Sequence, residues 1–263
     1  MNERIITFLA HPLIVQDKLI HPEPAKLSIP NWYKKIPNPD DHLRLTLKAC
    51  KPFLDSLTAG YILKNPIEQK IFFNTPNPNG KISTWVEISR ELSHLENIAR
   101  ATNVNLGDET HPIEQVGGMK CPYVRQNQAF NIYKILNPWT VHVPSGYSVL
   151  YLPPINRYED KFEIFSGIVD GPCPLPTNFP CVFKKQGSWI LKKGDPVATV
   201  FPFKRENWKM KIMEKSEKGN AGSLFRLGSV LRKWYENNIW IKKNLKMHKL
   251  LHLHLEIKEL IKI

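Results

Sequence analysis

Two polar side chains border strand-like runs in the middle of the chain, where they could do chemistry. Asp170 comes directly after the hydrophobic run 167–169, a position in which a carboxylate could orient a water molecule or a ribose hydroxyl. It also precedes Gly171 and Pro172, and a turn-forming role fits that context better. Ser148 follows a glycine turn and could contact a phosphate through its hydroxyl and the turn amides, or it could simply begin a strand. Asp170 and Ser148 are the candidate catalytic residues.

Two further groups combine cations with prolines or an aromatic ring. Arg157 follows Pro153 and Pro154 at an expected loop tip, where a guanidinium could bind an anion or be an ordinary surface charge. The segment 204–209, which comes after the last expected strand, joins cations to a tryptophan and could stack a base and neutralise phosphate. Its tryptophan could instead plug the end of the β structure, which the pattern favours. The candidate nucleic-acid residues of this group are Lys204, Arg205, Trp208 and Lys209.

Histidines and glutamates occur at spacings that could serve acid/base or metal chemistry. His111 and Glu114 are separated by Pro112, so their side chains need not converge. Near the carboxyl end, three ligand types would share one face either of a strand or of a helix. An amphipathic tail explains this spacing more simply, and no metal is assigned. The residues concerned are His248, His252, His254 and Glu256.

The charge is concentrated toward the carboxyl end. The chain of 263 residues has a formal net charge of +13, and residues 204–263 hold 15 Lys or Arg against 6 Asp or Glu. Such an end could bind phosphate backbones, acidic proteins or anionic surfaces, or it could be a solvated face. The sequence therefore allows a nucleotide or nucleic-acid partner for this region.

The first residues lack the pattern of an export signal, and no segment is long and apolar enough to span a bilayer. The four cysteines show neither a CxxC pair nor zinc spacing, so we expect free thiols. These features predict a protein of the cytoplasm, its own or that of an infected host cell, with no membrane partner and no established cofactor.

The elements that would position these residues are mostly strands. The 22 prolines and 13 glycines disfavour a helical bundle. Short runs bounded by turn residues favour a sandwich or barrel. We expect a hairpin from strands 69–74 and 81–88, and a first strand over 5–15. A helix within 43–57 should start or kink at Pro52 and end before Gly60. The other expected strands span 130–136, 139–143, 147–152, 162–169, 181–184, 189–191 and 197–201.

The predicted class is mainly β (α+β overall), with a β-clip-like or distorted barrel or sandwich core and a few helices. One β-rich domain should span 1–210, with a long loop excursion at 89–121. A basic, helical carboxyl-terminal extension should span 211–263.

Four segments in a fixed order carry a resemblance to a known superfamily. They are 144–148 (PSGYS), 167–170 (GIVD), 176–179 (PTNF) and 193–200 (KGDPVATV). Their order over 138–203 resembles the core of the trimeric dUTPase and dCTP deaminase superfamily. That resemblance implies a β-clip fold, a trimeric homo-oligomer and a nucleotide site. The ligand-binding candidates are Gly146, Ser148, Arg157, Asp170 and Asn178.

A closer likeness covers most of the chain. Segments 46–57 and 202–206, together with 146–148 and 167–170, resemble phrases of an uncharacterised family of phage and marine-bacterial proteins, a domain of unknown function. This likeness implies a phage context but no particular reaction.

Three functions follow as hypotheses. The first is a non-enzymatic β-barrel binding module for a nucleotide, a nucleic acid or a protein. It is motivated by the basic carboxyl end and by the absence of the superfamily's Ala-Gly-x-Asp-Leu phosphate motif. The second is a diverged dUTPase-like enzyme acting on deoxynucleotides, which would bring Mg²⁺ as its cofactor. The third is a virion structural component.

Overall fold

The computed structural model describes residues 4–39, 46–88, 132–214 and 235–240. The chain divides into two compact units. One consists of 1–36 and 52–213, and the other of 37–51 and 214–263. In the second unit, Lys51 pairs with Glu236 at 3.0 Å and lies over the ring of Trp240. The loop 89–121, the group His111 and Glu114, and the cluster 248–256 all lie outside the described residues.

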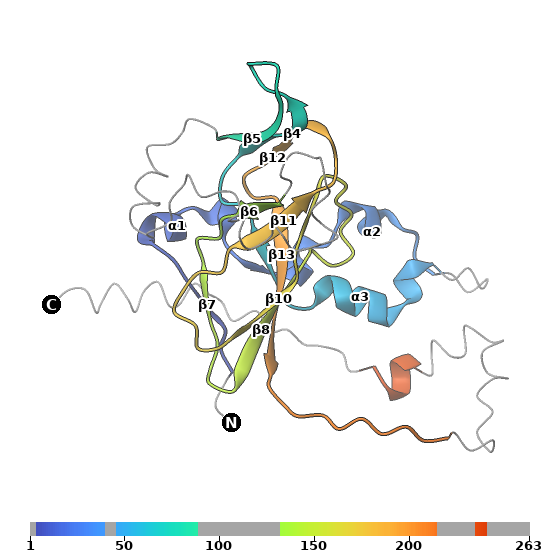
Figure 1. The fold of residues 1–263 in the computed structure, drawn as a ribbon. Coiled ribbons are helices and arrows are strands. Elements are labelled where there is room, and N and C mark those ends of the chain that lie inside the picture. The colour runs from blue at the N-terminus through green and yellow to red at the C-terminus, as the bar shows by residue number, and fades with distance from the viewer. Residues whose placement is uncertain (1–3, 40–45, 89–131, 215–234, 241–263) are drawn as a thin grey trace. The chain divides into compact units, whose positions relative to one another are not determined.

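The first unit is mainly β, as the sequence predicts (Figure 1). Its described strands form four antiparallel sheets that do not close into a barrel. The sheet orders are β1-β7, β10-β8-β13-β3-β2, β6-β11-β9 and β12-β4-β5. The early strands are β1 (Thr7–Leu9), β2 (Glu23–Pro24), β3 (Tyr61–Lys64), β4 (Gln69–Pro76), β5 (Ile82–Ile88) and β6 (Ile132–Ile135). The later ones are β7 (Thr140–His142), β8 (Tyr147–Leu152), β9 (Phe162–Ile164), β10 (Gly167–Asp170), β11 (Phe179–Phe183), β12 (Gly187–Leu191) and β13 (Pro196–Lys204).

The helices in the described residues are short. They are α1 (Pro12–Gln16), α2 (Asn31–Lys35), α3 (Lys51–Thr58), one helical turn at 235–238, and three 3-10 turns at Lys18–Ile20, Ala25–Ser28 and Leu47–Ala49. Pro52 lies in the first turn of α3. Backbone N–H groups there have no partner within the helix, so the N–H that proline lacks costs no hydrogen bond. Gly60, just after α3, has φ +74°, a left-handed conformation that glycine adopts without strain. None of the described helices is long and apolar enough to cross a membrane.

Two predicted strands are wrong in extent. The run 5–15 contains β1 and then α1, because the His11 side chain accepts a hydrogen bond from the backbone N–H of Leu13 and Pro12 begins the helix. The run 162–169 is two strands with a break at 165–166. Its first half, β9, pairs with β11, and its second half, β10, pairs with β8.

Side chains of the larger sheets share one core. The aromatic part joins Phe183 edge-on to Trp189 at 5.4 Å, and Trp189 stacks on Phe162 at 5.9 Å. Tyr151 of β8 and Val200 of β13 lie opposite each other, and both belong to this core. Phe162 matters for the site below, because it belongs to the core and also lines a pocket.

Candidate functional site

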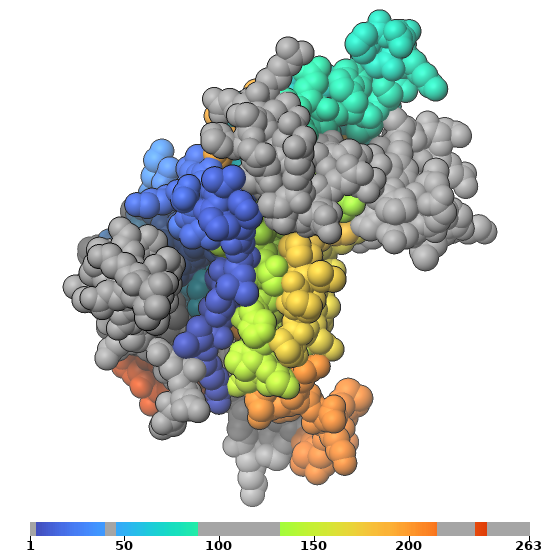
Figure 2. All heavy atoms as spheres, turned by 90° about the vertical axis from the view of Figure 1, so that its left-hand side faces the viewer, coloured from blue at the N-terminus to red at the C-terminus, as the bar shows by residue number. Residues whose placement is uncertain are grey.

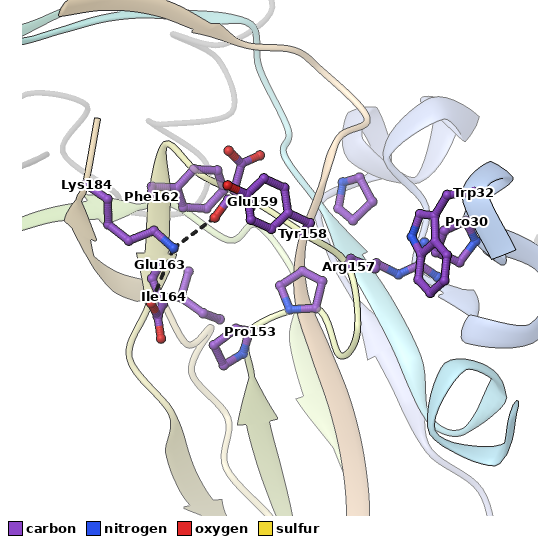
Figure 3. Close-up of a pocket in the computed structure, with 12 residues that line it drawn as sticks. Pro30, Trp32, Pro153, Arg157, Tyr158, Glu159, Phe162, Glu163, Ile164 and Lys184 are labelled. Atoms are coloured by element: carbon purple, nitrogen blue, oxygen red, sulfur yellow. Dashed lines mark hydrogen bonds and ion pairs between the residues drawn. The ribbon is translucent and has the colours of Figure 1, made fainter. Parts of the chain in front are cut away.

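A pocket of about 660 Å³ opens in the first unit where four segments that are distant in sequence meet (Figure 3). This volume is in the range of small-molecule sites, about 300–1,000 Å³. Pro30 and Trp32 come from the start of α2, and Arg157 comes from the loop after β8. The remaining lining residues are Pro153, Pro154, Tyr158, Glu159, Phe162, Glu163, Ile164, Lys184 and Pro196.

The loop that carries Arg157 is fixed by hydrogen bonds to neighbouring elements. The Ile155 N–H donates to Thr199 Oγ1 at 3.2 Å, and Asn156 Nδ2 donates to Ser56 Oγ at 2.7 Å. The Arg157 N–H closes a turn onto the Pro154 carbonyl at 3.2 Å. Asn156 has φ +52°, a conformation that asparagine tolerates better than most residues. The loop is therefore held in place before any ligand binds.

Arg157 supplies the positive end of the pocket. Figure 3 shows its side chain running from the loop toward Pro30 and Trp32. Its Nη2 is buried and has no hydrogen-bond partner among the described residues. Glu23, whose charge acts on Arg157, forms its ion pair with Lys64, at 3.2 Å. Burial lowers the pKa of the Arg157 guanidinium, and the Glu23 carboxylate opposes that shift. The guanidinium thus has donor capacity that the described protein leaves unused, which is unfavourable for a half-buried cation.

The other end of the pocket presents acceptors. Lys184 Nζ donates to the Glu159 carbonyl at 2.8 Å and to Glu163 Oε2 at 3.4 Å, so this end is not simply negative (Figure 3). Glu159 Oε1 accepts the Lys161 N–H at 2.9 Å. The remaining oxygens of the two carboxylates can accept hydrogen bonds from a ligand amino group.

The walls and floor between these ends are apolar and flat. Phe162 and Ile164 are buried at the floor. The rings of Trp32 and Tyr158 are 43% and 90% exposed, so both are available to cover a ligand. Proline and aromatic rings offer flat apolar surfaces against which a planar ring packs well. The pocket can therefore hold a planar group between a cation and two carboxylates.

Ser148 and Asp170, the candidate catalytic pair, contact each other at a different place. They are directly opposite in the β8–β10 pair, and Ser148 Oγ donates to Asp170 Oδ1 at 2.6 Å. Arg205 Nη1 lies 3.2 Å from Asp170 Oδ2. The Arg205 N–H also donates to the Gly146 carbonyl at 2.9 Å, and its Nη2 donates to the Gly171 carbonyl at 3.4 Å. We call these contacts among Ser148, Asp170 and Arg205 the Arg205 clasp. In the clasp the three side chains pair with one another and with neighbouring backbone carbonyls.

The structure does not bring the five ligand-binding candidates together. Gly146 and Ser148 lie at the start of β8, and Asp170 lies opposite Ser148 at the end of β10, whereas Arg157 lies in the loop beyond the end of β8. Asn178 is elsewhere, and its Oδ1 accepts the backbone N–H of Asn137. Among the described residues no group of three or more His, Cys, Asp or Glu could hold a metal ion.

The nucleic-acid candidates divide into paired and exposed members. Lys204 pairs with Glu206 at 2.6 Å, and Arg205 pairs with Asp170. Trp208 does not plug the core, since it is almost fully exposed. Lys209 beside it is also exposed.

Sequence reasoning missed most of the pocket. Trp32, Tyr158, Glu163 and Lys184 were not among the predicted site residues. The dipeptide Pro153-Pro154 before Arg157 was the available clue, because it shapes the loop that presents the guanidinium. No protein-family model matches the chain, and no curated protein is significantly similar to its sequence.

Proposed function

We propose that the protein is a binding module for a small anionic ligand that carries a planar ring, and that the ligand occupies the Arg157 pocket. The observation that carries this proposal is the guanidinium with an unused buried donor beside exposed aromatic rings. An anionic group would pair with Arg157, and the ring would lie against Trp32, Tyr158 or the prolines. Nucleotides, the class predicted from the sequence, have this chemistry.

The carboxylate oxygens at the end of the pocket opposite Arg157 narrow the class of ligand that we expect. Glu159 and Glu163 favour a ring that bears an amino group, because a carboxylate pairs with an N–H donor and repels a carbonyl oxygen. We therefore expect cytosine and adenine nucleotides to bind more tightly than thymine nucleotides.

The enzyme hypothesis has weaker support. Ser148 and Asp170 meet, as an active site would require, but each is engaged by the other or by the Arg205 clasp. Deoxynucleotide hydrolysis with Mg²⁺ therefore remains an alternative, to be examined by product analysis if Mg²⁺ changes binding.

A thermal-shift screen against the deoxynucleoside mono- and triphosphates, with and without Mg²⁺, tests the proposal. A ligand at about 100 times its Kd stabilises the native state by about 2.7 kcal/mol, which corresponds to roughly 5–10 °C in a chain of this size. We expect such a shift with wild type and its loss in Arg157→Met. Asp170→Asn is the matched control and should keep the shift. No shift with any nucleotide, or loss in Asp170→Asn and not in Arg157→Met, would overturn the proposal.

A further inference from the structure

The segment after β13, residues 206–213, is an exposed arm with a regular apolar pattern. Trp208, Met210 and Ile212 are 87%, 88% and 86% exposed, and Met213 follows them at 71%. Lys209 and Lys211 alternate with them. In an extended chain, alternate residues share one side, so the three apolar side chains form one stripe. Described residues of the chain leave that stripe uncovered.

The root of the arm is fixed although the arm itself is exposed. Arg205 is held by its three contacts in the Arg205 clasp, at the corner of β8 and β10. Beyond this point the arm leaves the lower end of β13 and runs away from the sheet (Figure 1). The space-filling view shows the orange residues of this region projecting from the end of the green and yellow strands (Figure 2).

The sheet beside the root has an apolar outer face. Leu150 in β8 lies opposite Ile168 in β10 and opposite Phe201 in β13, so their side chains share one side of the sheet. Phe203 continues this row two residues along β13. The other side of the same strands is the core. Ile168 is 63% exposed and Phe203 is partly exposed. We call Ile168, Leu150 and Phe203 the outer face.

We propose that the arm of one copy packs on the outer face of a second copy of this chain, and that the contact is reciprocal. Each copy carries both an apolar stripe and an apolar acceptor face, and such self-complementary surfaces produce symmetric dimers. The backbone of the arm runs away from its own sheet (Figure 1), which favours a second copy over folding back.

The exposed area fits a dimer. Each fully exposed apolar side chain offers roughly 100 Å², and a tryptophan about 200 Å². The arm and the outer face together offer roughly 600 Å² per copy, or about 1,200 Å² in a reciprocal pair, which is the lower end of the range for specific interfaces. Nucleic acid is a poorer occupant, because Met210 and Ile212 have no ring for stacking. Lys204 and Arg205 are, moreover, already paired with carboxylates.

Sedimentation equilibrium of the full chain across a concentration series tests this proposal. We expect wild type to be dimeric at about 100 µM, with a Kd in the micromolar range or below. Trp208→Ser combined with Ile212→Ser should weaken the dimer at least tenfold, and Ile168→Ser should weaken it from the other side. Ile82→Ser, a half-exposed isoleucine on the β4–β5 hairpin, is the matched control and should leave the Kd unchanged.

A mixing experiment separates reciprocal exchange from nonspecific stickiness. A copy with a defective arm and a copy with a defective face can together form one intact arm–face contact. The mixture should therefore associate more tightly than either variant does by itself. A monomeric wild type, an arm variant with an unchanged Kd, or a mixture no tighter than its parts would each overturn the proposal. Lys209→Gln with Lys211→Gln should keep the dimer, and its loss there would indicate a charge-driven contact instead.

Discussion

Ser148 Oγ donates a hydrogen bond of 2.6 Å to Asp170 Oδ1 across the β8–β10 pair. The serine is buried, and the carboxylate at the surface also pairs with Arg205. Through these two contacts Asp170 joins β8, β10 and the end of β13, because Arg205 directly follows β13. The pair that the sequence singles out for catalysis thus has a structural task, which is to fix the corner from which the arm departs.

The Arg205 clasp predicts a modest stability effect. Asp170→Asn should fold cooperatively and lower the free energy of unfolding by about 1 kcal/mol, because a half-exposed ion pair contributes little and the Ser148 bond is partly kept. Urea denaturation measures this change. Glu206→Gln, which removes the neighbouring exposed pair with Lys204, is the control and should leave the urea midpoint unchanged. A protein that fails to fold would mean that the carboxylate does more than close the clasp.

Gly60 and Gly80 offer a matched pair of glycine substitutions. Both have φ near +75°, but a Cβ at Gly60 would lie 2.5 Å from the Val200 carbonyl oxygen, whereas a Cβ at Gly80 would meet nothing within 4 Å. Gly80→Ala should cost about 1 kcal/mol from the left-handed conformation. Gly60→Ala should cost at least about 3 kcal/mol, because backbone must also move. Equal urea midpoints for the two variants would contradict the close approach of Gly60 to β13.

The thiols should differ sharply in reactivity. Cys181 is fully buried, and burial raises the pKa of its thiol, so the reactive thiolate is not populated near neutral pH. In a variant with Cys50, Cys121 and Cys173 changed to Ser, the native protein should not react with a thiol reagent at pH 8. It should react at once in concentrated urea. Restoring the exposed Cys50 should add one fast-reacting thiol. Rapid native labelling of Cys181 would contradict the core described here.

Replacing Arg157 should not destabilise the protein, because its buried Nη2 has no hydrogen-bond partner among the described residues. Arg157→Met keeps the volume in the apolar surroundings of Pro30 and Trp32 but removes the desolvated charge. The variant should melt at the same temperature as wild type or above it in the absence of ligand. Differential scanning calorimetry tests this expectation. Arg205→Met is the comparison, and it should melt lower because it breaks the clasp. A lower melting temperature for Arg157→Met would show that the guanidinium is satisfied in the native protein.

Local patterns predicted the elements better than they predicted the site. β8 has the predicted bounds, and the β4–β5 hairpin forms around the turn at 77–80, because turn residues and alternation are readable within a few residues. The run 162–169 was predicted as one strand although β9 and β10 join different sheets, and the turn-type dipeptide Ser166-Gly167 is the local signal that the prediction passed over. The partner of each strand depends on contacts that are distant in sequence.

The pocket could not be predicted for the same reason. Trp32 and Arg157 are 125 positions apart in the sequence, and they line one cavity only after α2 and the loop beyond β8 pack together. The loop's own anchors, Thr199 and Ser56, are also remote. Asp170 and Ser148 were predicted separately, each beside its own strand, and their contact follows from the antiparallel pairing of β8 with β10, which the sequence did not predict.

Isothermal titration calorimetry of dCMP and dTMP into wild type, Arg157→Met and Asp170→Asn tests the central claim most directly. We predict that dCMP binds wild type and Asp170→Asn with similar Kd, that dTMP binds more weakly, and that Arg157→Met weakens dCMP at least tenfold. Loss of one charge-assisted pair in a half-buried site corresponds to about 1.5–3 kcal/mol, or roughly ten- to a hundredfold. Binding that survives in Arg157→Met and disappears in Asp170→Asn would contradict the account and move the ligand to the corner of β8 and β10.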